Sequence, residues 1–358
     1  MENDTQPAYL QLYRGLREAI VAGDYAYGEK LPSKRTLAEE QGLSIVTVEH
    51  ALSLLADEGY IRSVERSGCF ANFRLEDGFA SSPATARGLP VHAHDPRRAA
   101  DLPFPVSVLT KTMRRVLSEQ QEEILSSSPE QGREELRQAI CAYLKRSRGI
   151  SASPEQVVVG CGSEYLYGLI VQMLGRARVY AIESPSYKKI RQVYAQYGVQ
   201  VRMLPLGEDG VETSALLGTD ADVLHITPYR SFPSGVTASA SKRHMYLQWA
   251  QTGDRMLIED DFESEFSVSR KPEETLFAHS ERENVLYLNT FSKTISPSIR
   301  VGYLVLPPAM TQIYRDTVGF YACPVPTFIQ LVLAELMLDG DFERQINRVR
   351  RRRRESFL

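Results

Sequence analysis

The sequence contains few cysteines and histidines, and neither residue type is clustered. Four cysteines and six histidines are spread over 358 residues, with no Cys-x-x-Cys pair and no His-x-x-x-His spacing. Cysteines scattered in this way predict reduced thiols rather than a disulfide framework. A metal site is not expected, because protein zinc sites take their ligands from closely spaced cysteines and histidines.

Long apolar runs and a strong net charge are also missing. No stretch approaches the roughly 20 apolar residues of a membrane span. The opening Met-Glu-Asn-Asp-Thr-Gln has neither the basic nor the apolar region of a signal peptide, which predicts a cytoplasmic protein. The net charge is −3, so the whole chain is not an evident polyanion binder. The length and the 43% hydrophobic fraction predict two domains with sizeable cores.

The first 75 residues have the pattern of a small helical domain. Residues 8–22 predict one helix whose apolar side consists of Leu10, Tyr13, Leu16 and Ile20. Ser33 and Ser44 are placed to cap two shorter helices. A sharp turn at Gly42 separates these two helices. Residues 60–73 predict a β-hairpin. Three helices and a hairpin indicate a winged helix-turn-helix, although a docking domain has a similar pattern.

The residues themselves narrow this choice. The stretch "GEKLPSKRTLAEEQGLSIVTVEHALSLLADEGYIRSVERSGCF" closely resembles the GntR family of bacterial transcription regulators, and the resemblance covers nearly all of residues 8–73. It implies a double-stranded DNA operator as partner. It also implies that four residues lie at the DNA, namely Arg35, Ser44, Thr47 and Gly68.

Two further residues are candidates for DNA contacts. Lys34 forms a predicted basic patch with Arg35, Arg62 and Arg66, and His50 lies on the expected recognition helix, where a histidine more often has no role in base recognition. Ile45 and Glu49 stand where many family members are basic. Residues 1–75 hold eight Lys and Arg against eleven Asp and Glu, so a monomer should bind DNA weakly and a homodimer is expected.

After this head the pattern changes twice. Residues 76–101 are rich in Ala, Ser, Pro and Gly without periodicity, which predicts a flexible linker. Residues 102–358 then contain short apolar runs that alternate with helix-length segments, which predicts an α/β domain with a mostly parallel, seven-stranded sheet. The runs are Val157–Val159, Val179–Ile182, Val199–Met203, Val223–Ile226, Met256–Ile258, Val285–Leu288 and Val301–Val305.

Three features follow these expected strands, where ligands bind in such folds. Gly160 and Gly162 precede a helix start at Ser163, which suits a phosphate but also a simple tight turn. Glu259, Asp260 and Asp261 follow a buried run; one carboxylate is expected to be structural, and an aspartate there could face a cationic ring nitrogen.

The third feature is "TFSKTISPSIR", with Lys293 among small hydroxyl residues. A lysine in such a place can be partly desolvated and available for Schiff-base chemistry, whereas a lone lysine is more often a solvated surface residue. Nearby hydroxyls and Arg300 could bind a phosphate. An amine, an aspartate and a phosphate site are together what pyridoxal phosphate requires.

Here too the residues resemble a known family. "NTFSKTISPSIRVGYL" and "IEDDFESEF" resemble the lysine and aspartate motifs of fold type I, pyridoxal-phosphate-dependent aminotransferases, and residues 101–358 look like the large domain of that fold. Joined to a GntR-like head, the chain resembles the MocR/PdxR subfamily of transcription regulators. The resemblance implies a Schiff base at Lys293, a pyridine partner at Asp260, ring stacking by Tyr187, and phosphate contacts from the backbone of Ser163 and Glu164 and the side chains of Ser292 and Arg300.

Some positions depart from this family. Phe262 stands where relatives often have a tyrosine, Arg230 and Ser231 where they commonly have His-Gln, and Phe232 where aminotransferases have an asparagine. These changes argue against transamination more than against cofactor binding.

The chain ends in a predicted helix with an arginine run, which is either its polar face or a nucleic-acid tail. In the family, this helix leads to a smaller C-terminal domain, so we expect a C-terminal truncation. Three functions are considered: a DNA-binding regulator that senses cofactor or a small amine or amino-acid effector, an aminotransferase with a fused DNA-binding head, and an inactive remnant. We favour the regulator, because an intact helix-turn-helix is difficult to explain in a plain enzyme.

Overall fold

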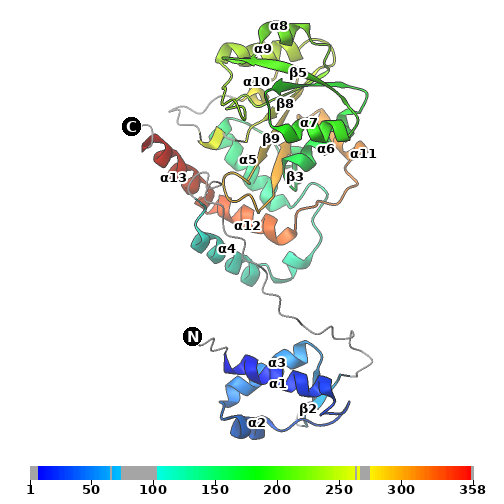
Figure 1. The fold of residues 1–358 in the computed structure, drawn as a ribbon, viewed down its shortest axis with the longest axis vertical. Helices are drawn as coiled ribbons and strands as arrows, with labels where there is room; N and C mark the ends of the chain where they lie inside the picture. Colours follow the sequence, from blue (N-terminus) through cyan, green and yellow to red (C-terminus); the bar gives the residue numbers. More distant parts are fainter. Residues whose placement is uncertain (1–6, 65–66, 74–102, 263, 267–274, 356–358) are drawn as a thin grey trace. The chain divides into compact units, whose positions relative to one another are not determined.

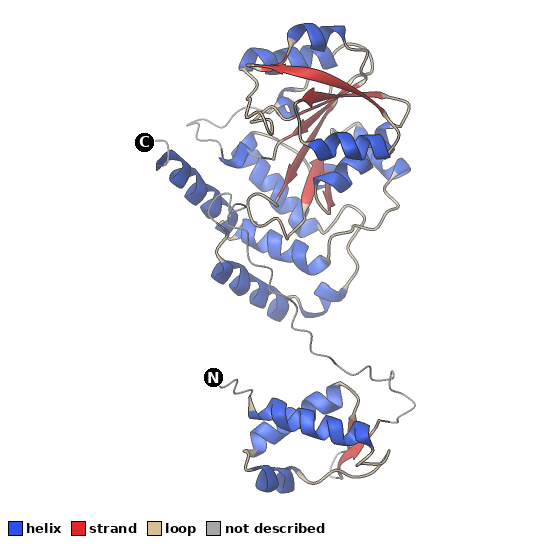
Figure 2. Cartoon of the chain, in the orientation of Figure 1, coloured by secondary structure: helices blue, strands red, loops and turns tan. Residues whose placement is uncertain are grey.

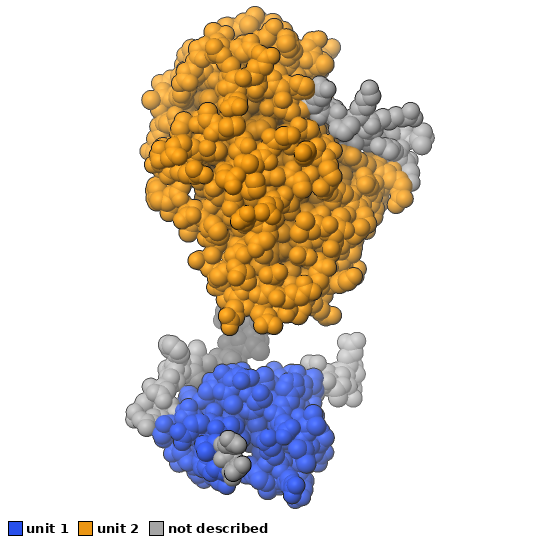
Figure 3. All heavy atoms as spheres, turned by 180° about the vertical axis from the view of Figure 1, so that it is seen from behind, with its two compact units in different colours: residues 1–93 blue, residues 94–358 orange. Residues whose placement is uncertain are grey.

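The computed structural model describes residues 7–64, 67–73, 103–262, 264–266 and 275–355. The chain divides into two compact units, residues 1–93 and 94–358 (Figure 3). The division falls within the predicted linker, residues 76–101, which lies outside the described residues.

The first unit is three helices and a hairpin, as predicted (Figure 1). Ser33 and Ser44 cap the second and third helices, accepting hydrogen bonds from the backbone N–H groups of Thr36 (3.2 Å) and Thr47 (3.1 Å). The two strands pair antiparallel. The elements are α1 (Ala8–Ala22), α2 (Lys34–Gln41), α3 (Ile45–Asp57), β1 (Ile61–Val64) and β2 (Gly68–Ala71).

The core of this unit lies where the helical periodicity placed it, with one change. Tyr13, Leu16 and Ile20 of α1 are buried as expected, but Leu12 is buried with them and Leu10 is only half-buried. They pack against the inward side of α3, whose buried residues are Val48, Ala51, Leu52 and Leu55.

The second unit is built on an eight-stranded sheet of order β3-β10-β9-β8-β7-β4-β5-β6. All seven predicted strands are present, but the predicted number of seven is wrong. The eighth strand, β6, has two residues and is too short to show a pattern in the sequence. Six strands run in the same direction, whereas β10 is antiparallel to both of its neighbours and β6 is antiparallel to β5. The strands are β3 (Val157–Gly160), β4 (Val179–Ser184), β5 (Gln200–Gly207), β6 (Gly210–Val211), β7 (Val223–Ile226), β8 (Met256–Asp260), β9 (Val285–Thr290) and β10 (Gly302–Val305).

Helices cover both faces of this sheet (Figure 2). Val158 packs with α6, α7 and α11 on one face, while Val157 and Val159 pack with α5, α12 and α13 on the other, because strand residues alternate in direction. The helices are α4 (Val106–Glu119), α5 (Glu134–Arg148), α6 (Ser163–Leu174), α7 (Lys188–Gln196), α8 (Thr213–Gly218), α9 (Ala240–Ala250), α10 (Leu276–His279), α11 (Met310–Thr317), α12 (Thr327–Leu338) and α13 (Asp341–Glu355).

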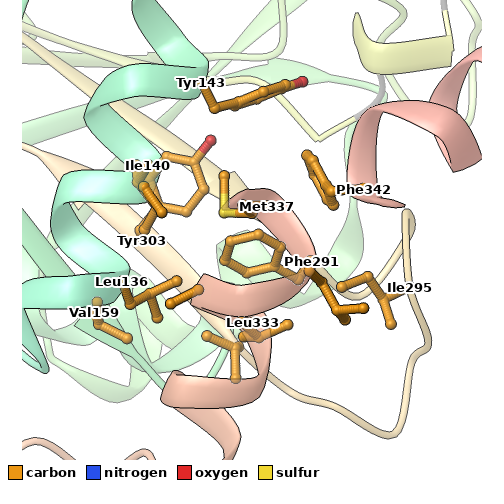
Figure 4. Close-up of a cluster of buried hydrophobic side chains, with 14 of the residues drawn as sticks. Leu136, Ile140, Tyr143, Val159, Phe291, Ile295, Tyr303, Leu333, Met337 and Phe342 are labelled. Atoms are coloured by element: carbon orange, nitrogen blue, oxygen red, sulfur yellow. The ribbon is translucent and has the colours of Figure 1, made fainter. Parts of the chain in front are cut away.

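The core beneath α5 and α12 also holds the start of α13 (Figure 4). Phe342 packs edge-on against Phe291, with ring centroids 5.5 Å apart. Farther along α13, Arg348 and Arg350 donate to the backbone oxygens of Pro103 (2.6 Å) and Glu265 (2.5 Å). These contacts favour the interpretation of the arginine run as the polar face of a packed helix.

Candidate functional site

A pocket of about 290 Å³ lies where the parallel strands end at their carboxyl termini. Residues that follow β3, β7, β8 and β9 line it, and β10 begins at the same edge because it runs antiparallel to β9. The pocket brings together all seven residues predicted for the cofactor: Ser163, Glu164, Tyr187, Asp260, Ser292, Lys293 and Arg300. Its other lining residues are Tyr167, Ile190, Thr227, Phe232, Phe262, Thr290 and Pro297.

One end of the pocket is suited to an anion. Helix α6 begins at Ser163 after Gly162 (φ 96°), and the first N–H groups of a helix have no partner within it. A Cβ on Gly162 would lie 3.0 Å from Nη2 of Arg300, so glycine permits the guanidinium to approach the helix start. Ser292 Oγ is buried without a hydrogen-bond partner among the described residues. Helix start, guanidinium and hydroxyl together fit a phosphate group.

Glu164 supplies a protein carboxylate at this same end. It forms ion pairs with Arg300 and with Lys189, whose Nζ lies 2.5 Å from Oε1. Burial raises the pKa of Glu164, but the hydrogen bonds from Lys189 and Arg300 outweigh it and leave the pKa below its ordinary value. A bound phosphate would therefore share Arg300 with Glu164.

Asp260 lies on the floor of the pocket at the end of β8. It is buried, and its Oδ2 accepts a hydrogen bond from the Tyr167 hydroxyl (2.5 Å). Its Oδ1 is buried without a hydrogen-bond partner among the residues that the structure describes. A buried carboxylate oxygen without a partner is costly, so Asp260 is suited to a ligand that presents a cationic donor.

A buried polar chain holds Asp260 from behind. His225 Nε2 lies 3.3 Å from Asp260 Oδ2, and its Nδ1 lies 2.7 Å from the Tyr194 hydroxyl. Burial, and then neighbouring Asp260, raise the pKa of Tyr167 well above its ordinary value, so this hydroxyl remains a donor. His225, Tyr167 and Tyr194 were not predicted; the available signal was a single histidine within the apolar run Val223–Ile226.

Lys293 lies in the turn after β9, and its Nζ is 5.9 Å from the ring centroid of Phe262. The predicted desolvation is not seen, because Lys293 is exposed. The rings of Tyr187 and Phe232 pack edge to face nearby, with centroids 6.3 Å apart. The Lys293 amine and these two rings thus line the same pocket.

The two carboxylates beside Asp260 point into the protein instead. Asp261 pairs with buried Arg148 (2.7 Å), and Glu259 accepts from the Tyr229 hydroxyl (2.6 Å) and from the backbone N–H groups of Leu276 and Phe277 (both 2.9 Å). We expected one structural carboxylate in this run, and the structure has two.

The residues predicted at DNA lie on α2, α3 and the hairpin. Arg35 is exposed, but Lys34 pairs with Glu49 (2.8 Å), which reduces the predicted basic patch. Arg66 lies outside the described residues. Gly68 opens β2 with φ 117°, a backbone conformation that favours glycine.

Three of these residues have contacts within the head. Ser44 caps α3, and its Oγ lies 2.8 Å from the Thr47 hydroxyl. The His50 ring stacks on Tyr9 of α1, with centroids 4.1 Å apart and an interplanar angle of 18°. Ser44 and His50 therefore each have a structural role besides any contact with DNA.

Comparison with known proteins agrees with this two-part architecture. Residues 8–71 match the model of the gntR family of bacterial regulatory proteins, and residues 95–356 match that of aminotransferase class I and II. The described residues include no helix that is long and apolar enough to cross a membrane.

Curated relatives share both parts. The chain is 31% identical to the uncharacterized HTH-type transcriptional regulator YdeL of Bacillus subtilis, over 96% of this chain and 76% of that protein. It is 30% identical to the HTH-type pyridoxine biosynthesis transcriptional regulator PdxR of Corynebacterium glutamicum, over 97% of this chain and 77% of that protein. It is 28% identical to the probable rhizopine catabolism regulatory protein MocR of Rhizobium meliloti, over 96% of this chain and 74% of that protein.

Solved structures match the second unit. Kynurenine aminotransferase of Pyrococcus horikoshii (25% identical) and the α-aminoadipate aminotransferase LysN of Thermus thermophilus (27%) both superpose with a TM-score of 0.62. Each match covers 71% of this chain and 66% of the solved chain, so this chain spans about two thirds of their length. The chain therefore belongs to the helix-turn-helix transcription regulators, MocR and PdxR among them, that join a GntR-type DNA-binding domain to an aminotransferase class I and II domain.

Proposed function

We propose that this regulator binds pyridoxal phosphate in the pocket of its aminotransferase-like unit, and that it senses this cofactor or a small amine or amino-acid effector. The observation that carries this proposal is the buried Oδ1 of Asp260, which has no hydrogen-bond partner in the described part of the chain and lies in the same pocket as Lys293 and the start of α6. A carboxylate for a ring nitrogen, an amine for an aldehyde and a site for a phosphate are the three requirements of this cofactor.

Each lining residue has a role in this proposal. Asp260, held by Tyr167 and His225, would balance a protonated pyridine nitrogen, and Tyr187 would lie against the ring. Lys293 would provide the amine for covalent attachment. The phosphate would be held by the backbone of Ser163 and Glu164 and the side chains of Ser292 and Arg300. When bound, the cofactor supplies an aldehyde that reacts reversibly with amines.

Two apolar residues favour sensing over turnover. Phe262 and Phe232 line the pocket where polar side chains would otherwise bond to cofactor or substrate, and phenylalanine offers no hydrogen bond. The relatives YdeL, PdxR and MocR all carry names of regulators. The name of PdxR makes cofactor supply one candidate for the regulated process. We further propose that the protein acts as a homodimer on operator DNA in the cytoplasm.

The assignment of Lys293 is tested by absorbance and mass. We expect added pyridoxal phosphate to give wild type a new absorbance band, and borohydride to fix one cofactor per chain. Lys293→Ala should give no fixed cofactor, because it lacks the amine. Lys188→Ala, which removes an exposed lysine on neighbouring α7, should behave as wild type.

Two results would contradict the proposal. Fixed cofactor on Lys293→Ala would show that another amine is used. Sustained formation of keto acid from an amino acid and a second keto acid would establish an aminotransferase instead of a sensor.

A further inference from the structure

Helix α3, the second helix of the helix-turn-helix, begins with two exposed apolar residues. Ile45 is 47% exposed and Val46 is 74% exposed, directly after the capping residue Ser44. Single exposed apolar residues are common on protein surfaces and need no explanation. Here, however, two branched apolar side chains stand next to each other on the side of α3 that does not face the core.

The rest of α3 offers little of the chemistry that usually recognises bases. Its sequence, IVTVEHALSLLAD, contains no lysine or arginine, so it cannot supply the bidentate contact to guanine. Glu49 pairs with Lys34 (2.8 Å), and the His50 ring is stacked on Tyr9. Apolar groups are therefore the most exposed feature of the first turn.

The position of these groups suits one feature of duplex DNA. In helix-turn-helix proteins the second helix lies in the major groove, and its N-terminal residues contact the base edges. The C5-methyl group of thymine is the apolar group that a base pair presents in that groove, and apolar side chains recognise it. A helix start that presents branched apolar side chains matches this methyl group and not the polar edges of guanine or cytosine.

We infer that Ile45 and Val46 determine operator specificity by direct contact with thymine methyl groups in the major groove. The inference rests on the DNA-binding function of the head and adds which base it selects. It also explains how a recognition helix without a basic residue distinguishes sequences, while Arg35 and other exposed groups contact the backbone.

The test uses the full chain and a duplex that it enriches from a randomised DNA library. Each thymine of this duplex is replaced in turn by uracil, which removes only the methyl group. At one or two positions we expect wild-type affinity to fall about fourfold, the equivalent of about 0.8 kcal/mol for one buried methyl group.

Variants assign the contact to these residues. In Val46→Ala or Ile45→Ala, at least one of these uracil penalties should disappear, because the contacting side chain is already missing. Val64→Ala removes an exposed valine from β1 and should keep every penalty. Circular dichroism should show all three variants folded, since each truncates an exposed side chain.

Failure of this inference can be distinguished from failure of sequence-specific DNA binding. If a specific duplex is enriched but uracil has no effect at any position, or if both α3 variants keep every penalty, the inference is overturned while DNA binding stands. If no sequence is enriched, sequence-specific binding by the head is itself overturned.

Discussion

Three consecutive carboxylates, Glu259, Asp260 and Asp261, have different roles because a strand directs alternate side chains to opposite sides. Asp260 could be predicted from its motif and its place after an apolar run. The role of Glu259 could not, because its partners Tyr229, Leu276 and Phe277 lie 17 to 30 residues away in the sequence. Likewise, only the fold reveals that His225 contacts Asp260.

Glu265 lies in the same buried group of carboxylates as Glu259 and Asp261, and it makes the stability of the second unit depend on pH. Burial, and then the charge of Asp261, raise the pKa of Glu265 to about 7. Its Oε1 accepts from Asn289 (2.7 Å), whereas Oε2 has no partner among the described residues, which costs less for a neutral carboxyl than for a carboxylate. The charges of Glu259 and Asp261 act on Arg148, and Arg148 in turn acts on Glu265, so one cation serves three carboxyl groups and at least one of them is favoured in its neutral form.

This arrangement predicts that the second unit loses stability as pH rises from about 4.5 to 7. In that range the folded state binds a proton that the unfolded chain has released, so the free energy of unfolding falls with pH. Glu265→Gln keeps the acceptor for Asn289 and cannot ionise. Between pH 4.5 and 7 its free energy of unfolding should therefore fall by on the order of 2 kcal/mol less than that of wild type.

Urea unfolding can measure this effect through the single tryptophan, Trp249, which is buried in α9 of this unit. Glu281→Gln, at an exposed carboxylate, is the matched control and should keep the wild-type pH dependence. Equal pH dependence in wild type and Glu265→Gln would show that Glu265 is ionised when buried.

At the scale of elements, the sequence predicted those with strong local signals. Serine caps and helical periodicity located α2 and α3, and apolar runs located seven strands. Strand β6 and the short helices α8 and α10 have too few residues to show a period. The reversed direction of β10 could have been inferred, because only residues 291–301 separate it from β9, and a parallel crossover needs a dozen or more.

The cap of α3 supports a prediction that separates stability from DNA contact. Ser44→Ala removes the acceptor for the Thr47 N–H and should lower the stability of the head by about 1 kcal/mol. Ser44→Asp keeps a capping oxygen and should restore that stability. If Ser44 also lies at the DNA, as the resemblance implies, the added negative charge of Ser44→Asp should weaken DNA binding.

Hydrogen exchange of α3 amides and thermal melts followed by circular dichroism measure the stability. Ser53→Ala, at an exposed position within the same helix, controls for loss of a hydroxyl and should be neutral or slightly stabilising. Unchanged protection of α3 in Ser44→Ala would show that the cap does not stabilise the helix.

At the scale of the whole molecule, the two units have separate cores and separate chemistry. Motifs in the sequence were sufficient to predict both units. The influence of one unit on the other is measured by a free energy of coupling, and no local motif encodes that quantity. Regulation therefore requires that a ligand in the pocket and DNA at the head favour, or disfavour, the same state of the protein.

Such coupling must act equally in both directions, which gives a stringent prediction. We expect saturating pyridoxal phosphate to change the affinity for the enriched duplex by about 5-fold or more, within the usual range for coupled sites. The duplex must then change the affinity for pyridoxal phosphate by the same factor and in the same direction. Fluorescence anisotropy of labelled duplex and absorbance titration of the cofactor measure the two factors.

Two variants connect this coupling to the pocket. Lys188→Ala should preserve both changes in affinity, and Lys293→Ala should abolish both if attachment at Lys293 is the event that is sensed. Equal DNA affinity with and without cofactor in wild type would leave cofactor binding intact, but it would exclude the cofactor itself as the signal and leave an amine or amino acid as the effector to test.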